Sequence, residues 1–210
     1  LIDGEHGPNT LTEWLPQLQA LAASGTPPII RIPNHDSWMI KQALDLGAQT
    51  LLVPMVNSGE EAAAVVRACR YPPEGIRGMG AALARAGGYG AVQDYAATAN
   101  AQICVLVQAE SVTAMQDLEA IAATEGVDGV FIGPADLGAD MGLRDDLQNA
   151  ELWEGIEDGI ARIREHGKAA GIIVTGAEAE ARMIAAGVNF LGRGSDAWVL
   201  QNGLSALAKT

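Results

Sequence analysis

Seven short apolar runs rich in β-branched residues recur along this 210-residue chain, about 30 residues apart on average, and each is followed by a helical pattern or a loop. Such alternation is typical of repeated βα units that build a parallel sheet. The first run starts at Leu1, and the others cover residues 27–33, 50–56, 103–110, 129–137, 169–174 and 189–196. Helical patterns cover residues 10–25, 37–46, 58–70, 113–123, 150–166 and 177–186.

This pattern predicts an α/β fold, a single (β/α)8 TIM-type barrel domain over residues 1–210. Seven units are one short of eight, and LIDGEHGPN at the front reads as the second half of a strand, so we expect the first strand and helix to be missing from this sequence. A doubly wound open sheet fits the same alternation, but such sheets usually carry a glycine-rich phosphate fingerprint, and none follows a strand here. The longest irregular segment, residues 71–100, is rich in Gly and Pro and predicts a functional or interface role.

Charge and composition exclude several classes of partner. The net charge of −13 disfavours non-specific binding to nucleic acid or to an anionic membrane. No apolar run approaches the roughly 20 residues that cross a bilayer. Cys69 and Cys104 show neither metal-ligand spacing nor a disulfide framework, which favours a reducing cytoplasm.

Two of the expected strands end in carboxylates. VLVQAE delivers Glu110, and GVFIGPAD delivers Asp136. Parallel α/β enzymes build their sites at the carboxyl ends of strands, so we expect these acids to share a divalent cation. Two carboxylates with open coordination positions suit a hard cation such as Mg²⁺ or Mn²⁺.

Other polar residues are expected to converge on the same edge. Arg31 can form a two-pronged contact with a substrate carboxylate, and Gln108 lies two residues before Glu110. His6 suits a general base near neutral pH, with Asp3 as an orienting acceptor. A Schiff base would need a lysine in the site, but the three lysines fall outside the strand ends. We therefore expect a proton transfer next to a carbonyl group that the metal binds.

The segments LIDGEHGPN, RIP, GAQTLLVPMV, YPPEGIRG, VLVQAE and GVDGVFIGPADLGADMG, taken in order, resemble the HpcH/HpaI family of class II pyruvate aldolases. The resemblance runs over essentially the whole chain. It implies a homohexamer of (β/α)8 barrels that cleaves 4-hydroxy-2-oxo acids, of the heptanedioate type, into pyruvate and an aldehyde, as in the catabolism of aromatic compounds. It also implies a divalent cofactor, Mg²⁺ or Mn²⁺, with Co²⁺ or Zn²⁺ as alternatives.

The resemblance assigns roles residue by residue. It implies Glu110 and Asp136 as metal ligands, His6 as the catalytic histidine and Arg31 as the pyruvate-binding arginine. Asp3 and Asp45 match supporting acids, and Asp45 would reach the site of a neighbouring subunit. The remaining matches are substrate-binding positions: Gln108 beside the metal, and Gly133, Pro134, Ala135 and Asp136 around the pyruvate carboxylate.

Simpler interpretations stay open at several positions. Glu110 alone fits an acid at a helix N-terminus, and His6 alone fits a loop histidine. Arg77 and Arg85 in the long loop are expected at an interface or the surface, and Glu5 is either an outer partner of the metal or structural. The rival functions are an acyl-CoA lyase like the citrate lyase β-subunit, for which no basic patch is visible, and a barrel that binds 2-oxo acids without turning them over.

Overall fold

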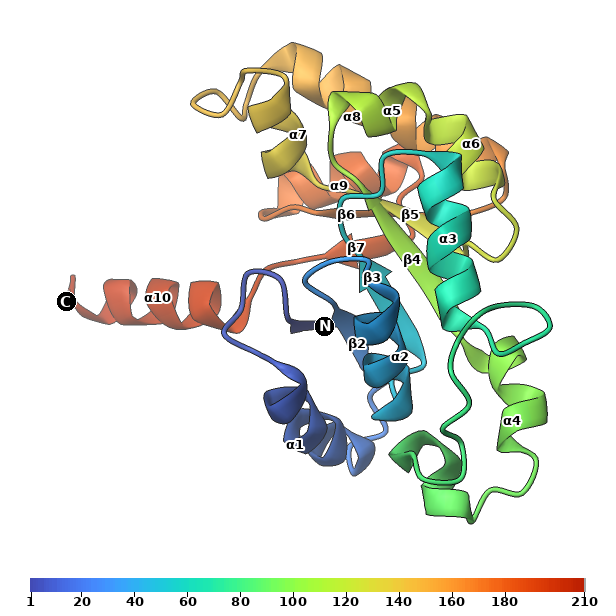
Figure 1. Ribbon diagram of the computed structural model, residues 1–210. Coiled ribbons are helices and arrows are strands. Elements are labelled where there is room, and N and C mark those ends of the chain that lie inside the picture. The colour runs from blue at the N-terminus through green and yellow to red at the C-terminus, as the bar shows by residue number, and fades with distance from the viewer. Residues whose placement is uncertain (210) are drawn as a thin grey trace.

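A computed structural model of the chain describes residues 1–209. Its centre is one curled sheet of seven parallel strands in the order β1 to β7 (Figure 1). The strands are β1 Ile2–Asp3, β2 Ile29–Arg31, β3 Thr50–Val53, β4 Cys104–Ala109, β5 Gly129–Ile132, β6 Ala169–Ile173 and β7 Phe190–Gly192. Every strand pairs with its sequence neighbour, and the described part of the chain contains no pairing between β1 and β7. The result is a curled half-barrel that is consistent with a TIM-like barrel.

Helices follow the strands, and most of them pack on the outer face of the sheet (Figure 1). They are α1 Leu11–Ala22, α2 Ser37–Asp45, α3 Gly59–Cys69, α4 Tyr95–Thr98, α5 Val112–Gln116, α6 Leu118–Ala123, α7 Pro134–Asp140, α8 Ala150–Glu165, α9 Ala177–Ala186 and α10 Asp196–Leu207. The expected capping box opens α1, where the Thr10 N–H donates to Glu13 Oε2 at 2.8 Å. No helix among residues 1–209 is both long and apolar enough to cross a bilayer.

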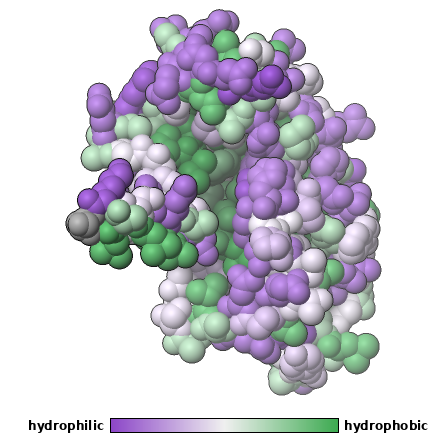
Figure 2. All heavy atoms as spheres, turned by 90° about the vertical axis from the view of Figure 1, so that its left-hand side faces the viewer, coloured by the Kyte–Doolittle hydropathy of each residue, from purple (hydrophilic) through white to green (hydrophobic). Residues whose placement is uncertain are grey.

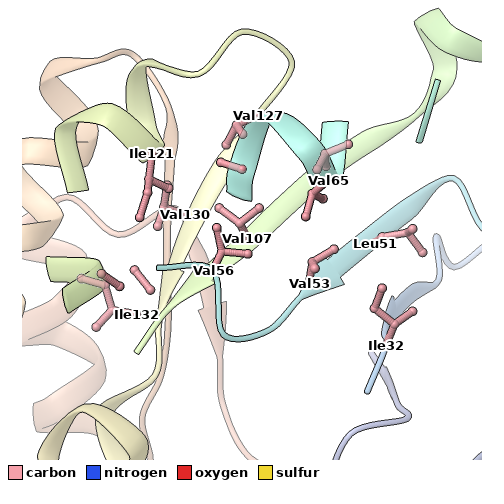
Figure 3. Packing of buried hydrophobic residues seen from close by; sticks show 14 of the residues in the cluster. Ile32, Leu51, Val53, Val56, Val65, Val107, Ile121, Val127, Val130 and Ile132 are labelled. Carbon is pink, nitrogen blue, oxygen red and sulfur yellow. The ribbon is translucent and has the colours of Figure 1, made fainter. Parts of the chain in front are cut away.

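The main core lies between the sheet and its helices. Val53, Val107 and Ile132 point outward from their strands and meet Val65 of α3 and Ile121 of α6 (Figure 3). The alternate strand residues point into the curve of the sheet and form a second, smaller cluster of Leu52, Leu106 and Phe131. Both faces of the central strands β3, β4 and β5 are therefore buried, which explains why these strands read as continuous apolar runs.

The expected strand over residues 129–137 is wrong in its second half. β5 ends at Ile132, and Pro134 opens α7 at a position where proline fits well, because its fixed φ suits the first helical turn and its missing N–H is not needed there. Asp136 therefore lies in the first turn of a helix rather than on a strand. The helix expected over residues 113–123 is divided into α5 and α6 at Asp117, whose φ of −103° and ψ of 17° depart from helical geometry.

The last helix was not expected from the sequence. α10 follows β7 and projects away from the body of the molecule (Figure 1). Trp198, Val199, Leu200 and Leu204 are exposed on it, and Figure 2 shows apolar side chains on this projection and in a hollow of the same face. The helix was missed because its apolar residues form no clear one-sided stripe next to a buried core.

The expected long loop contains short helical turns. Residues 71–100 hold the 3₁₀ turn η1 Arg85–Gly90, then α4, and the start of a second 3₁₀ turn, η2 Ala99–Gln102. Arg77 in this segment is only 2% exposed, so its expected place at the surface or an interface is wrong for the isolated chain. An ion pair with the partly buried Asp45, contact with the Tyr71 ring and a hydrogen bond to the Tyr95 hydroxyl hold it inside.

Candidate active site

An arginine ion pair lies where the first two strands end. β1 ends at Asp3 and β2 ends at Arg31, and their register places the two residues side by side. Arg31 Nε donates to Asp3 Oδ1 at 2.8 Å and Arg31 Nη2 to Asp3 Oδ2 at 2.7 Å. The third nitrogen, Nη1, lies 3.0 Å from Glu5 Oε2. This two-pronged contact fixes the plane of the guanidinium at the mouth of the sheet.

β4 brings a buried amide and a buried carboxylate to the same edge. Gln108 is 1% exposed and Glu110 is 3% exposed. Gln108 Oε1 lies 3.5 Å from Arg31 Nη1, and Gln108 Nε2 donates to Glu110 Oε2 at 2.6 Å. The other carboxylate oxygen, Oε1, accepts the backbone N–H of Met55 at 2.8 Å. A chain of polar contacts thus runs from Asp3 through Arg31 and Gln108 to Glu110, and it orients the Glu110 carboxylate.

The acids of this cluster experience opposite pKa shifts. Burial raises the pKa of Glu110, and the nearby negative charge of Asp136 raises it further. Burial also raises the pKa of Glu5, against the attraction of Arg31. Burial acts on Asp3 as well, but the hydrogen bonds from Arg31 and from backbone N–H groups outweigh it and lower the pKa of that carboxyl. The charged forms of Glu5 and Glu110 are therefore less favoured here than in water, whereas the charged form of Asp3 is more favoured.

The donor set suits a divalent cation. Glu5 Oε2 is buried and has no hydrogen-bond donor among residues 1–209, although it lies in ion-pair range of Arg31. Asp136, on the first turn of α7, is exposed and interacts electrostatically with Glu110. Carboxylate oxygens with excess negative charge fit a hard cation, with water or substrate completing its shell. The described residues contain no group of three or more His, Cys, Asp and Glu placed to hold a metal by themselves.

Gly133 is required by close packing. A Cβ on this residue would lie 2.5 Å from Glu110 Oε2 and 2.9 Å from Glu110 Cβ. Glycine therefore leaves the space that the Glu110 carboxylate occupies. Next in the chain, Pro134 and Ala135 begin α7, whose first turn leaves backbone N–H groups without helical acceptors. The amides of Ala135 and Asp136 therefore have no acceptor within the helix.

His6 lies at the rim of this cluster. Its side chain is 63% exposed, and its Nε2 lies 3.9 Å from Glu5 Oε2. Asp3 does not orient the imidazole as expected, because its carboxylate is occupied by Arg31 and accepts the backbone N–H of His6, at 3.4 Å. The imidazole is free to turn toward a bound molecule.

Asp45 lies apart from the other predicted residues. It ends α2, which runs back from the mouth to the opposite edge of the sheet. There Asp45 Oδ1 accepts a hydrogen bond from Arg77 Nη2 at 2.7 Å, and the Arg77 guanidinium lies 4.4 Å from the centre of the Tyr71 ring. One subunit therefore brings together Asp3, His6, Arg31, Gln108, Glu110 and the start of α7, but not Asp45.

Sequence reasoning missed one contributor to the site, Met55, and the pairing of Arg77 with Asp45 outside it. Met55 supplies a backbone N–H to Glu110 from a left-handed conformation, with φ of 54°. The identity of a side chain does not show whether the backbone N–H of the same residue donates to a distant acid. The sequence therefore contained no signal for the role of Met55. Arg77 was visible in the motif YPPEGIRG, but its partner Asp45 is distant in sequence.

Comparisons with known proteins show the family to which the chain belongs. The profile of the family described as HpcH/HpaI aldolase/citrate lyase matches residues 1–203. A hydroxypyruvate/pyruvate aldolase of Agrobacterium fabrum is 51% identical over 208 residues, which cover 99% of this chain and 78% of the relative. A 4-hydroxy-2-oxo-heptane-1,7-dioate aldolase of Escherichia coli is 50% identical over 208 residues, covering 99% and 79%.

A solved structure shares the fold over nearly the whole chain. It is a HpcH/HpaI aldolase/citrate lyase family protein from Burkholderia cenocepacia, with a TM-score of 0.94, 37% identity, and coverage of 99% of this chain and 83% of that one. Profile, sequence relatives and fold lead to one assignment. On these grounds the chain is a member of the HpcH/HpaI aldolase/citrate lyase family.

Proposed function

We propose that the protein is a divalent-metal-dependent aldolase that reversibly cleaves 4-hydroxy-2-oxo acids into pyruvate and an aldehyde. The observation that carries the proposal is the buried Glu110 carboxylate, which Gln108 connects to Arg31 at the strand ends and which lies near Asp136. The names of the relatives, both pyruvate-related aldolases, support the same reaction class.

Glu110 and Asp136 would hold the cation, which supplies positive charge where negative charge develops next to the carbonyl of the 2-oxo acid. Mg²⁺ and Mn²⁺ fit the oxygen donors best. Gln108 keeps the Glu110 carboxylate in place and limits water around it. The space beside Gly133 lets that carboxylate face the substrate end of the site.

The substrate carboxylate and keto group would lie between Arg31 and the start of α7. Arg31 is held in place by Asp3, and its Nη1, which lies 3.0 Å from Glu5 Oε2, would turn to the substrate carboxylate, with the Ala135 and Asp136 amides as further donors. His6, exposed at the rim, would take the proton of the 4-hydroxyl as the carbon–carbon bond breaks and return it in the reverse direction. This arrangement places one acid–base group and one anion clamp around the reacting carbons.

The predicted assembly and location belong to the same proposal. Asp45 can support catalysis only from a neighbouring copy, because it lies at the far edge of the sheet in its own subunit. We therefore retain the homohexamer as a proposal, which light scattering of the purified protein would test. Cys69 and Cys104 are both free, which suits the proposed cytoplasmic location.

The decisive experiment is exchange of the pyruvate methyl protons in heavy water, followed by NMR. The protein is treated with a chelator and measured with and without Mg²⁺ or Mn²⁺. We expect exchange only with metal, and strong loss in Glu110→Gln and Asp136→Asn. Glu154→Gln, a change of an exposed acid on α8, serves as the matched control and should exchange like the wild type. Pyruvate binding without exchange under any metal would support the non-catalytic alternative instead.

A further inference from the structure

An apolar cavity opens beside the candidate site. Its volume is about 710 Å³, and it lies between α7, the segment before α8, the end of β6 and the start of α9. This size falls in the range of small-molecule sites. Pro134 and Ala135 line the cavity and also begin the helix that carries Asp136. A molecule that reacts at the carboxylate pair can therefore extend into it.

The wall of the cavity is mainly hydrophobic. Leu147 is 38% exposed and Ile173 is 44% exposed, and both line the cavity together with Trp153 and Met183. Large apolar side chains exposed in one hollow indicate a site for an apolar ligand. A hydrogen bond joins two parts of this wall, because Trp153 Nε1 donates to the Leu147 carbonyl oxygen at 2.8 Å and holds the segment before α8 against that helix.

The charges around the cavity disfavour an anionic ligand. Arg182 is its only cationic lining residue, and Arg182 Nε donates to Glu157 Oε1. The guanidinium also lies over the Trp153 ring, 5.9 Å from its centre. Glu178, another lining residue, adds negative charge. A carboxylate placed here would meet no positive charge that lacks an acidic partner.

We propose that this cavity binds the carbon chain of the aldehyde and makes the enzyme select uncharged, apolar aldehydes over those that carry a carboxylate. The inference rests on the proposed aldolase function and adds the acceptor class to it. In the condensation, C3 of pyruvate loses one methyl proton and bonds to the aldehyde carbon, while the aldehyde oxygen gains one proton and becomes the 4-hydroxyl. The chain of the aldehyde beyond that carbon lies along Leu147 and Ile173.

The test is a series of straight-chain aldehydes from propanal to hexanal, with pyruvate as the donor and the metal-loaded protein. Each methylene group that the cavity buries raises the binding constant of the aldehyde by at most about fourfold. Since the cavity is open to solvent, we expect kcat/KM to rise roughly tenfold over the series. Butanal should exceed 4-oxobutanoate, its carboxylate-bearing counterpart, by a similar factor. A flat series, or a preference for 4-oxobutanoate, would overturn the inference.

Two variants separate the cavity from the rest of the site. Leu147→Asn should flatten the series and leave the exchange of pyruvate methyl protons, measured without aldehyde, unchanged. Ile184→Asn changes an exposed apolar residue of α9 that does not line the cavity, so it should keep the wild-type series. If the wild type shows no exchange, the proposed function fails. If exchange is normal but kcat/KM of Leu147→Asn still rises with aldehyde length as in the wild type, only the cavity assignment fails.

Discussion

Replacing Gly133 with alanine tests the packing of the site with a single methyl group. The residue has φ of −90° and ψ of 101°, which alanine adopts without backbone strain. The added Cβ would lie 2.5 Å from Glu110 Oε2, whereas non-bonded atoms rest about 3.5 Å apart or more, so the carboxylate must move by about 1 Å.

That movement works against two hydrogen bonds. Glu110 accepts from Gln108 at 2.6 Å and from the Met55 N–H at 2.8 Å, and a shift of this size weakens at least one of them. Overpacking of a dense site costs about 1–3 kcal/mol, and we expect Gly133→Ala to lower the free energy of unfolding by about 2 kcal/mol. A misplacement of this size at a reacting centre also predicts roughly a hundredfold slower methyl-proton exchange.

Urea unfolding and the NMR exchange assay measure the two effects. Gly155→Ala is the matched control, because nothing lies within 4 Å of its added Cβ and the residue is inside α8. It should exchange at the wild-type rate and gain about 0.5–1 kcal/mol of stability, as expected for glycine to alanine in a helix. If Gly133→Ala equals the wild type in both assays, the Glu110 carboxylate does not occupy the space beside Gly133, and the proposed site geometry is wrong.

Three further predictions concern charges and thiols. Asp45→Ala leaves the buried guanidinium of Arg77 without its ion-pair partner, so urea unfolding should show a loss of about 3–5 kcal/mol. The double variant with Arg77→Met should recover part of it, and no recovery would contradict the pairing. The hydrogen bond from Arg162 lowers the pKa of Glu119 from 4.5 to about 2, so this pair stabilises fully above pH 4.5 and its contribution is lost as the pH falls toward 2. Carbon NMR titration of Arg162→Met should find the pKa of Glu119 back near its ordinary value, and an unchanged value would rule out the pair. Burial raises the pKa of the Cys69 thiol to about 12, so at pH 8 only about one molecule in ten thousand carries its thiolate. In a Cys104→Ser variant, which removes the other free thiol, Ellman's reagent should therefore modify Cys69 only on unfolding, and rapid modification of the native variant would show that the Cys69 thiol is not buried.

The sequence predicted the site residues correctly where a charged side chain directly follows an apolar strand. Glu110 and Arg31 stand directly at strand ends, and the apolar run before each of these charged residues is enough to place it at the mouth of a parallel sheet. Asp136 was correctly associated with the same edge but assigned to the wrong element, because a buried strand and a short helix that begins with proline form one apolar run.

The sequence by itself determined the order of the βα units, the parallel sheet and the set of polar residues that its ends present. These follow from local periodicity and from the fixed direction of parallel strands, both of which act over short stretches of chain. Only the tertiary structure decided how those residues are used. Asp3 serves Arg31 instead of His6, Met55 contributes an amide, Arg77 is buried against Asp45, and an apolar cavity lies beside α7. Each of these depends on distances between segments far apart in the chain, which packing sets and local sequence does not encode.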